Sequence, residues 1–360
     1  MLDFTSSLYL GFDHRACDGS GEPLTLGKPA ALEEPPGAEE LGRSLAGLVG
    51  CQSAVLAPST LHLFWDLCEG LGRNGATFCA DRGVYRVSRM GLETAAAKGA
   101  QVLWFSHHDP DSLARQLTRA RGRPVVITDG FCPACGVPAP LGRYLEAVRR
   151  YGGLLVLDDT QALGILGFRE SGRGPYGTGG GGSLAFHSLA GDDIILVSSL
   201  AKAFGAPLAM LGAGSRLVSD FAADSATRVH CSPPSTAAIR AGARAVVLNR
   251  WRGDGLRLRL GSLIRGFRQR LAVAGWRVAG GYFPVQTVLC RGVAHAHETL
   301  LRLGIQAVPQ KAGLSFVLTA RHTQSEVEQA ARALCSIGSR LTGGNDEQLT
   351  VRTGNIRVRV

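Results

Sequence analysis

Short apolar runs alternate with amphipathic stretches through the first two thirds of the chain. The runs at 122–130, 153–159 and 192–199 each predict a buried strand. Between the first two, residues 141–152 repeat apolar positions every three or four residues and end at a glycine, which predicts a helix with a glycine stop. Strand, helix and strand in close succession predict a mainly parallel sheet with crossover helices, and hence an α/β fold.

The last third of the chain has a different order of elements. Residues 258–275 are amphipathic and end at a glycine, and 323–341 begin with a threonine followed three residues later by a glutamate, a capping box. Strand-like runs lie at 283–290 and 314–320. This order predicts a smaller α+β domain. The expected division is an N-terminal segment 1–50, a large domain 51–244, a small domain 245–345 and a tail 346–360.

Glycine is dense in one segment, residues 167–183. Its glycines match several spacings of dinucleotide-binding loops, but no strand precedes it and no helical pattern follows directly. We therefore expect a flexible surface loop or lid there.

The composition of the chain indicates which classes of partner and which cellular compartment to expect. The chain of 360 residues carries a net charge of +10, but its arginines are scattered without a basic run or interleaved aromatic residues, so we expect no nucleic-acid binding. It contains neither an apolar run long enough to span a bilayer nor a signal-peptide pattern at its start, so we expect no membrane association. Nine cysteines, an odd number over a long chain, indicate reduced thiols and a cytoplasmic location.

Cys132 and Cys135 form a C-x-x-C pair, a spacing used by redox and zinc sites. Because no second pair follows at the spacing of a zinc finger, we interpret them as two ordinary thiols and expect no metal.

The candidate chemistry begins at Lys202, one of four lysines, which lies among apolar and small residues at 197–214. A desolvated amine has a depressed pKa and attacks carbonyls. If the carbonyl belongs to pyridoxal 5′-phosphate (PLP), the site also needs a carboxylate for the pyridinium, a phosphate cradle and a group packed on the ring. Asp158 ends the strand at 153–159, and the carboxyl ends of parallel strands line one crevice, so Asp158 and Lys202 could face each other.

The phosphate cradle has candidates too. Ser199 lies three residues before Lys202, while Ser59 and Thr60 stand between a strand and an amphipathic helix at 56–67. Helix-initiating amides bind anions, although the default role of such serines is an N-cap. Asp158 likewise has the alternative role of a turn or helix cap.

Several longer segments carry a resemblance to a known family. "FTSSLYLGFDH" (4–14) is similar to an FxSNDYLGLxxH opening, "GLLVLDDTQALGILG" (153–167) to LxVDDAHGxGxLG, and "SSLAKAFG" (198–205) to TLGKAFG. "FSHHDPDSLARQL" (105–117) and "SFVLTARHTQSEVEQAARAL" (315–334) match two further motifs in order. Together they resemble the PLP-dependent fold-type I enzymes, most closely the α-oxoamine synthases such as 8-amino-7-oxononanoate synthase.

The resemblance implies a fold and a function. The fold would be a mainly parallel large domain with a smaller α+β domain, assembled as a homodimer. Lys202 would carry the internal aldimine and move the Cα proton, Asp158 would pair with the pyridine nitrogen, and Ser199 with the amides of Ser59 and Thr60 would hold the phosphate. The reaction would join an amino acid or amine to an acyl thioester, from CoA or a carrier protein, through a quinonoid.

This chain departs from the family at positions that serve the ring and the substrate. The ring-stacking histidine is replaced by Ser88, with Tyr85 close enough to supply a ring, and the histidine at the cofactor 3-hydroxyl by Gln161, which can still donate a hydrogen bond. The arginine that grips the substrate carboxylate is replaced by Ser315.

These departures leave alternatives open. The substrate could lack an α-carboxylate, another arginine or Lys311 could grip it, or the family reaction could be lost. An aminotransferase and a non-catalytic binding module therefore remain alternative functions. In the segment 229–242, His230 or Ser232 could reach a second subunit, or the segment could simply cap a helix after two prolines.

Overall fold

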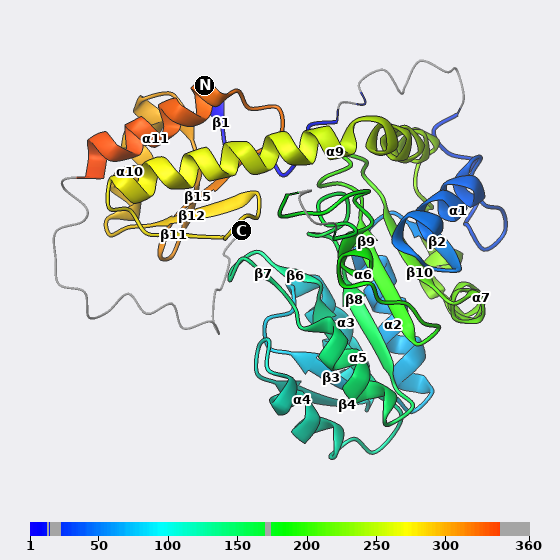
Figure 1. Ribbon diagram of the computed structural model, residues 1–360. Coiled ribbons are helices and arrows are strands. Elements are labelled where there is room, and N and C mark those ends of the chain that lie inside the picture. Colours follow the sequence, from blue (N-terminus) through cyan, green and yellow to red (C-terminus); the bar gives the residue numbers. More distant parts are fainter. Residues whose placement is uncertain (13, 15–22, 170–173, 339–360) are drawn as a thin grey trace.

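The computed structural model describes residues 1–12, 14, 23–169 and 174–338 (Figure 1). The predicted tail, 346–360, lies outside these residues. Within them, no helix combines the length and apolarity needed to cross a bilayer.

A seven-stranded sheet organises the first part of the chain, with spatial order β2-β10-β9-β8-β5-β3-β4. Neighbouring strands are parallel except at β10, which is antiparallel to both β2 and β9. The predicted mainly parallel sheet is therefore confirmed. The strands are β2 (Ser53–Ala57), β3 (Thr77–Asp81), β4 (Gln101–Phe105), β5 (Pro124–Asp129), β8 (Leu154–Asp158), β9 (Ile194–Ser199) and β10 (Ala209–Ala213).

Helices cover both faces of this sheet, which explains why its central strands are apolar without alternation. Val125 and Val156 share one apolar cluster with residues of α2, α3 and α7. Val126 and Leu155, one position along each strand, belong to a second cluster with α1, α4 and α5. The helices are α1 (Ala38–Val49), α2 (Thr60–Arg73), α3 (Arg86–Ala97), α4 (Pro110–Leu117), α5 (Leu141–Arg149), α6 (Gly182–His187), α7 (Ser215–Asp224) and α8 (Ala226–His230).

A smaller antiparallel sheet follows, with order β11-β12-β15-β14. The first residues of the chain join this part, because β1 (Leu2–Asp3) pairs in parallel with β13 (Ile305–Gln306). The remaining elements are β11 (Val278–Ala279), β12 (Val285–Leu289), β14 (Val308–Gln310), β15 (Gly313–Val317), α10 (Val293–Arg302) and α11 (Gln324–Gly338). The predicted capping box is present, since the Thr323 amide donates to Glu326 Oε2 at 2.7 Å and the Glu326 amide donates to Thr323 Oγ1 at 3.2 Å.

One long helix, α9 (Thr236–Val273), connects the two sheets (Figure 1). Ser235 caps it by accepting a hydrogen bond from the Ala238 amide at 3.1 Å, so the segment after the two prolines does initiate a helix. The expected boundary at 244/245 falls inside this helix, and the two parts are joined without a flexible linker. The division into domains stays a prediction.

The glycine-dense segment, expected to be a flexible surface loop or lid, is partly exposed, at Phe168 and Gly179, and partly packed against the rest of the protein. The Tyr176 ring is 4% exposed and its hydroxyl donates to the Tyr282 carbonyl. Asn249 of α9 donates to the Gly179 carbonyl at 2.9 Å, and the buried Arg257 donates to Asn249 at 2.8 Å. The glycines let the backbone pack closely, since a Cβ on Gly167 would lie 1.8 Å from the Thr178 oxygen. Residues 170–173 of this segment lie outside the described residues.

A two-stranded hairpin projects from the sheet after β5. It is formed by β6 (Phe131–Cys132) and β7 (Val137–Pro138). Its tip residue Gly136 abuts Gly280, where a Cβ on Gly136 would lie 2.4 Å from the Gly280 carbonyl carbon. Phe131 stacks on Phe283 with ring centroids 4.3 Å apart. The hairpin therefore links the large sheet to the loop between β11 and β12.

Candidate active site

Lys202 lies in the tight connection between β9 and the antiparallel β10. The Leu200 amide donates to the Leu208 carbonyl at 2.8 Å, which closes this connection, and Gly205 supplies a left-handed residue at φ +63°. The flanking side chains of Ala203 and Phe204 are buried. Burial lowers the pKa of Lys202, while the negative charges of Asp158 and Asp129 act in the opposite direction. The amine is thus desolvated and faces carboxylates.

Asp158 ends β8 beside β9, with Asp158 in register with Val197. It is 6% exposed, and its Oδ1 accepts a hydrogen bond from the Thr160 amide at 3.0 Å. Burial raises the pKa of Asp158, opposed by the Thr160 hydrogen bonds and by the charge of Lys202. Thr160 Oγ1 in turn accepts from the Ser199 amide at 3.0 Å, which ties the end of β8 to the end of β9.

Asp129 is a site residue that the sequence analysis did not single out. It ends β5 and lies in register with Asp158 on the neighbouring strand. Burial, and next the negative charge of Asp158, raise its pKa well above the ordinary value. The signal was available, because the apolar part of the run 122–130 is followed by Asp129 just as that of the run 153–159 is followed by Asp158. Two carboxyl groups therefore stand side by side near the amine of Lys202.

The start of α2 lies at the same edge of the sheet. Ala57 and Ser199 both pair with Ala209, so the ends of β2 and β9 are two strand spacings, about 10 Å, apart. Ser59 precedes α2 in an extended conformation, and its hydroxyl contacts His62 Nδ1 at 2.9 Å rather than capping the helix. The first turn of α2 contains no acidic residue. The first amides of α2, beginning at Thr60, thus receive no hydrogen bond from the Ser59 side chain, an arrangement in which a helix start can bind an anion.

Most of this chain matches a known protein family. Residues 30–334 match the family described as aminotransferase class I and II. The chain belongs to this family. The enzyme class, the PLP cofactor and the α-oxoamine synthase resemblance expected from the motifs are confirmed by this match together with the curated relatives.

Those relatives are named 8-amino-7-oxononanoate synthase. The protein from Alkalilimnicola ehrlichii is 31% identical over 82% of this chain and 75% of the relative. The protein from Marinobacter nauticus is 30% identical over 95% of this chain and 88% of the relative.

Solved structures show the same fold. The serine palmitoyltransferase of Sphingomonas wittichii superposes with a TM-score of 0.80 over 93% of this chain and 86% of that one, at 17% identity. The 8-amino-7-oxononanoate synthase of Francisella tularensis superposes with a TM-score of 0.72 over 94% and 97% of the two chains, at 16% identity. The expected fold-type I architecture is thus confirmed.

In this member of the aminotransferase class I and II family, the ring beside the lysine comes from Tyr85. The Lys202 amine lies 5.8 Å from the centroid of the Tyr85 ring, and Tyr85 is 55% exposed. The Tyr85 amide donates to Asp129 Oδ1 at 3.2 Å, which holds the start of α3 against the site. Ser88 is fully buried one turn further into α3 and its hydroxyl has no hydrogen-bond partner among the described residues. The exposed ring of Tyr85, not the Ser88 hydroxyl, is therefore presented to the site.

Gln161 follows β8 and is held by Tyr9. The Tyr9 hydroxyl donates to Gln161 Oε1 at 2.8 Å, and Tyr9 is almost completely buried. Because the amide oxygen accepts this bond, the amide nitrogen is the end left to donate elsewhere. This geometry fits the role expected of Gln161 as a hydrogen-bond donor.

Ser315 lies on β15 of the smaller sheet. It is 4% exposed and its hydroxyl pairs with Thr287 Oγ1 at 2.7 Å. A pair of neutral hydroxyls offers neither the charge nor the forked geometry of the family arginine. Lys311, a suggested replacement, lies exposed in the turn before β15. His230 and Ser232 are both exposed, and their suggested reach into a second subunit stays a prediction.

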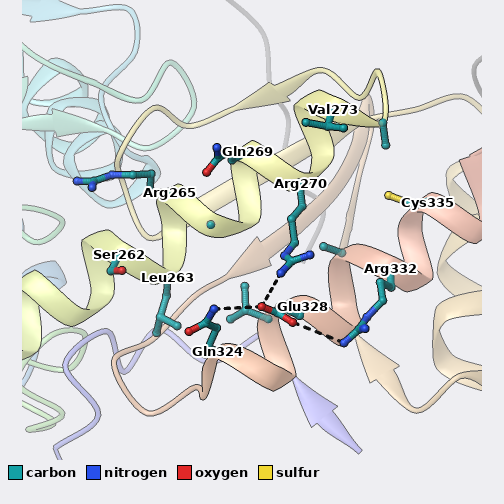
Figure 2. Close-up of a pocket in the computed structure, with 14 residues that line it drawn as sticks. Ser262, Leu263, Arg265, Gln269, Arg270, Val273, Gln324, Glu328, Arg332 and Cys335 are labelled. Carbon is teal, nitrogen blue, oxygen red and sulfur yellow. Dashed lines mark hydrogen bonds and ion pairs between the residues drawn. The ribbon is translucent and has the colours of Figure 1, made fainter.

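A groove between α9 and α11 lies outside this site (Figure 2). Glu328 is surrounded there by Gln324, Arg270 and Arg332, with Arg270 Nη2 at 2.5 Å and Arg332 Nη2 at 3.6 Å. The hydrogen bond from Gln324 and the neighbouring arginines lower the pKa of Glu328. Its carboxylate is thus engaged in ion pairs, and we assign the groove no chemistry.

The buried carboxyl group of Asp159, next to Asp158, leads to a testable prediction about the pH dependence of stability. Burial raises the pKa of Asp159 to about 7, and its Oδ2 accepts from the Ser183 amide at 3.0 Å. Between about pH 4 and 7 the folded protein holds a proton that the unfolded chain has released, so this group makes stability fall as pH rises. Asp159→Asn keeps the acceptor without titrating. We expect the variant to match the parent near pH 4 and to be about 2–4 kcal/mol more stable at pH 8, measured by urea unfolding.

The exposed carboxylate Asp220 on α7 provides the matched control. Asp220→Asn should leave the pH dependence of unfolding unchanged. An identical pH profile for Asp159→Asn and the parent protein would contradict the assigned burial of this carboxyl group.

Proposed function

We propose that this protein joins an amino acid or amine to the acyl group of a thioester, using PLP held at the carboxyl edge of the large sheet. The observation that carries the proposal is the meeting of Lys202, Asp158 and the α2 N-terminus at this edge, in a chain of this family. The curated relatives described above are named 8-amino-7-oxononanoate synthase, and the fold neighbours include serine palmitoyltransferases.

The residues at the site fit PLP. The uncapped amides of α2 and the Ser199 hydroxyl are suited to the phosphate, while Asp158 is a buried carboxylate placed to hold a proton on the pyridine nitrogen. Tyr85 is exposed beside the amine and is suited to cover one face of the ring. The Gln161 amide is placed to donate to the ring oxygen.

When bound, PLP supplies an electron sink for the bond broken at the amino carbon of the substrate. Residues of this chain move the proton and set the charge around it. The desolvated amine of Lys202 has the depressed pKa that a base needs to accept a proton from that carbon and return it. The Asp158 carboxyl lies beside this amine, and the positive charge of Lys202 opposes the rise in its pKa that burial causes.

The substrate side of the site is less charged than in the family pattern. Since Ser315 and Thr287 form a neutral pair, we propose that the amine substrate binds without a forked ion pair from β15. Amines without an α-carboxylate therefore belong in the substrate panel beside amino acids.

The experiment that tests this function measures thiol release. The purified protein, reconstituted with PLP, is incubated with amino acids or amines together with acyl-CoA or acylated carrier protein. We expect free thiol and an acylated amine, by mass spectrometry, only when both substrates are present. Conversion of the cofactor to its amine form by the amine donor alone, without thiol release, would identify an aminotransferase instead. If the protein binds no PLP, it would be a binding module.

Two further properties are proposed with it. We propose a homodimer, since the resemblance places the family's sites at a dimer interface. We also propose a cytoplasmic location, which is supported by the eight cysteines of the described part of the chain, all of them free thiols.

A further inference from the structure

A second cluster of reactive side chains lies beside the candidate active site, at the outer end of the same sheet edge. His107 and His108 follow β4, and Cys132 and Cys135 belong to the β6–β7 hairpin that follows β5 (Figure 1). One ligand atom each of His107, Cys132 and Cys135 lies within 4.8 Å of the others. The chain thus folds two histidines from one loop onto two cysteines from another.

Two distances at Cys135 are close to those of ligands that share a metal ion. Cys135 Sγ lies 3.6 Å from His107 Nε2 and 3.9 Å from His108 Nδ1. In a tetrahedral zinc site with Zn–S near 2.3 Å and Zn–N near 2.0–2.1 Å, a sulfur and a nitrogen stand about 3.6 Å apart. Both imidazoles therefore approach the thiol at the spacing that a common ion would impose.

Asp81, the last residue of β3, orients the histidines. It is 1% exposed, and its Oδ1 lies 2.7 Å from His107 Nδ1 while its Oδ2 accepts from the His108 amide at 3.2 Å. With Nδ1 bound to a carboxylate, His107 turns Nε2 toward the cysteines. This carboxylate–histidine pairing is the usual outer support of zinc ligands.

His108 carries two further marks of a constrained position. Its backbone is left-handed at φ +55°, which is uncommon for a residue other than glycine, and its ring stacks on His107 at 3.8 Å. Its Nε2 is buried without a hydrogen-bond partner among the described residues. This strained backbone directs His108 Nδ1, the nitrogen suited to bind a shared ion, toward the Cys135 thiol.

We propose that Cys132, Cys135, His107 and His108 bind one Zn²⁺ ion in a closed tetrahedral site, with Asp81 as a positioning residue. Two thiolates and two imidazoles complete the coordination, and binding releases the two thiol protons to solvent. Without an open position, the ion is structural. It fixes the hairpin that packs against Gly280 and Phe283, and so holds the smaller sheet against the carboxyl edge where Asp129 lies.

A redox-active pair of thiols is the competing interpretation of C-x-x-C. It needs neither imidazoles directed at the sulfur nor a carboxylate behind them, whereas a zinc site uses both. In the sequence, no second C-x-x-C pair accompanies Cys132 and Cys135, which favours two ordinary thiols, whereas in the fold the further ligands are the adjacent histidines of the loop after β4.

The test measures metal directly. Bound metal is first removed from the full-length protein with a chelator. The protein is then reloaded with ZnCl₂ under reducing conditions, separated from free metal and analysed by elemental mass spectrometry. We expect one zinc per chain, and less than one tenth of that in Cys132→Ser and Cys135→Ser. The matched controls are Cys335→Ser and Cys231→Ser, which should retain one zinc. Circular dichroism of each variant separates loss of metal from loss of fold.

Two further readouts address the ligands. Cobalt loading should give the visible and near-ultraviolet bands of a tetrahedral thiolate site in the parent protein and not in Cys135→Ser. Asp81→Asn should weaken zinc binding about 10- to 100-fold in competition with a chelator, since it disturbs the orientation of the histidines but removes no ligand. These readouts do not depend on the proposed enzymatic function, and Lys202→Ala should still bind one zinc.

Three results would overturn the proposal. One is a parent protein that takes up no stoichiometric zinc after reloading. The second is equal zinc content in the parent and in both cysteine variants. The third is a Cys132–Cys135 disulfide that forms as readily with excess zinc as without it.

Discussion

Lys202→Ala should lose the thioester reaction by at least about 10³-fold, because no other group described at this edge combines a desolvated amine with two facing carboxylates. The variant should also lose covalent fixation of the cofactor by borohydride. The chain makes the measurement simple, since its four lysines, Lys28, Lys98, Lys202 and Lys311, give few labelled peptides. Thiol release and peptide mass mapping are the two readouts.

Lys98 offers the matched control for this experiment. It lies exposed at the end of α3 and pairs with Glu69 at 2.5 Å. Lys98→Gln should retain full activity and full labelling of Lys202. Borohydride fixation of the cofactor at another lysine in the parent protein would refute the assignment of Lys202.

Asp158→Asn should reduce the same activity by about 10²–10³-fold, the effect of removing one preorganised charge from a buried site. The amide keeps the size of the side chain and can still accept from the Thr160 amide, so the fold should survive. It cannot hold a proton on the pyridine nitrogen as an anion does. Because Asp158 acts to raise the pKa of Lys202, its loss should lower that pKa further.

Two other variants separate charge from structure. Asp158→Glu restores the negative charge and should recover part of the activity. Asp159→Asn, at the adjacent buried position, should change stability and leave the cofactor's protonation intact. Equal activity in Asp158→Asn and the parent protein would exclude Asp158 as the partner of the pyridine nitrogen and direct attention to Asp129.

The sequence predicted the parallel sheet well, because its strands are continuous apolar runs that end in polar residues. The same pattern located Asp158, and it applies equally to Asp129, which follows the apolar residues of the run 122–130. Tyr85 and Ser88 could not be ranked from sequence. Their order at the start of α3 does not reveal that Tyr85 faces Lys202 whereas Ser88 points into the core.

The predictions from sequence differ from the structure where residues far apart in the chain contact each other. The glycine-dense segment packs against α9 because Asn249 donates to Gly179 from 70 positions away. Just before the segment, Arg257 donates to Gly164 from 93 positions away. The buried side chains of Asn249 and Arg257 also explain why the sequence pattern did not predict the first half of α9. Gly253 interrupts the helical pattern, but a Cβ there would lie 2.4 Å from Asn249 Oδ1, so glycine makes room for the buried polar pair.

The pairing of β1 with β13 has a consequence for how the molecule is made. Leu2 lies opposite Ile305, and Phe4 stacks on His322 with centroids 4.4 Å apart. At ribosomal speeds, about 15 to 60 s separate the emergence of these partners. Leu2 and Phe4 therefore stay without these partners until residues 305–322 have been synthesised, and the smaller sheet gains its contacts with β1 only then.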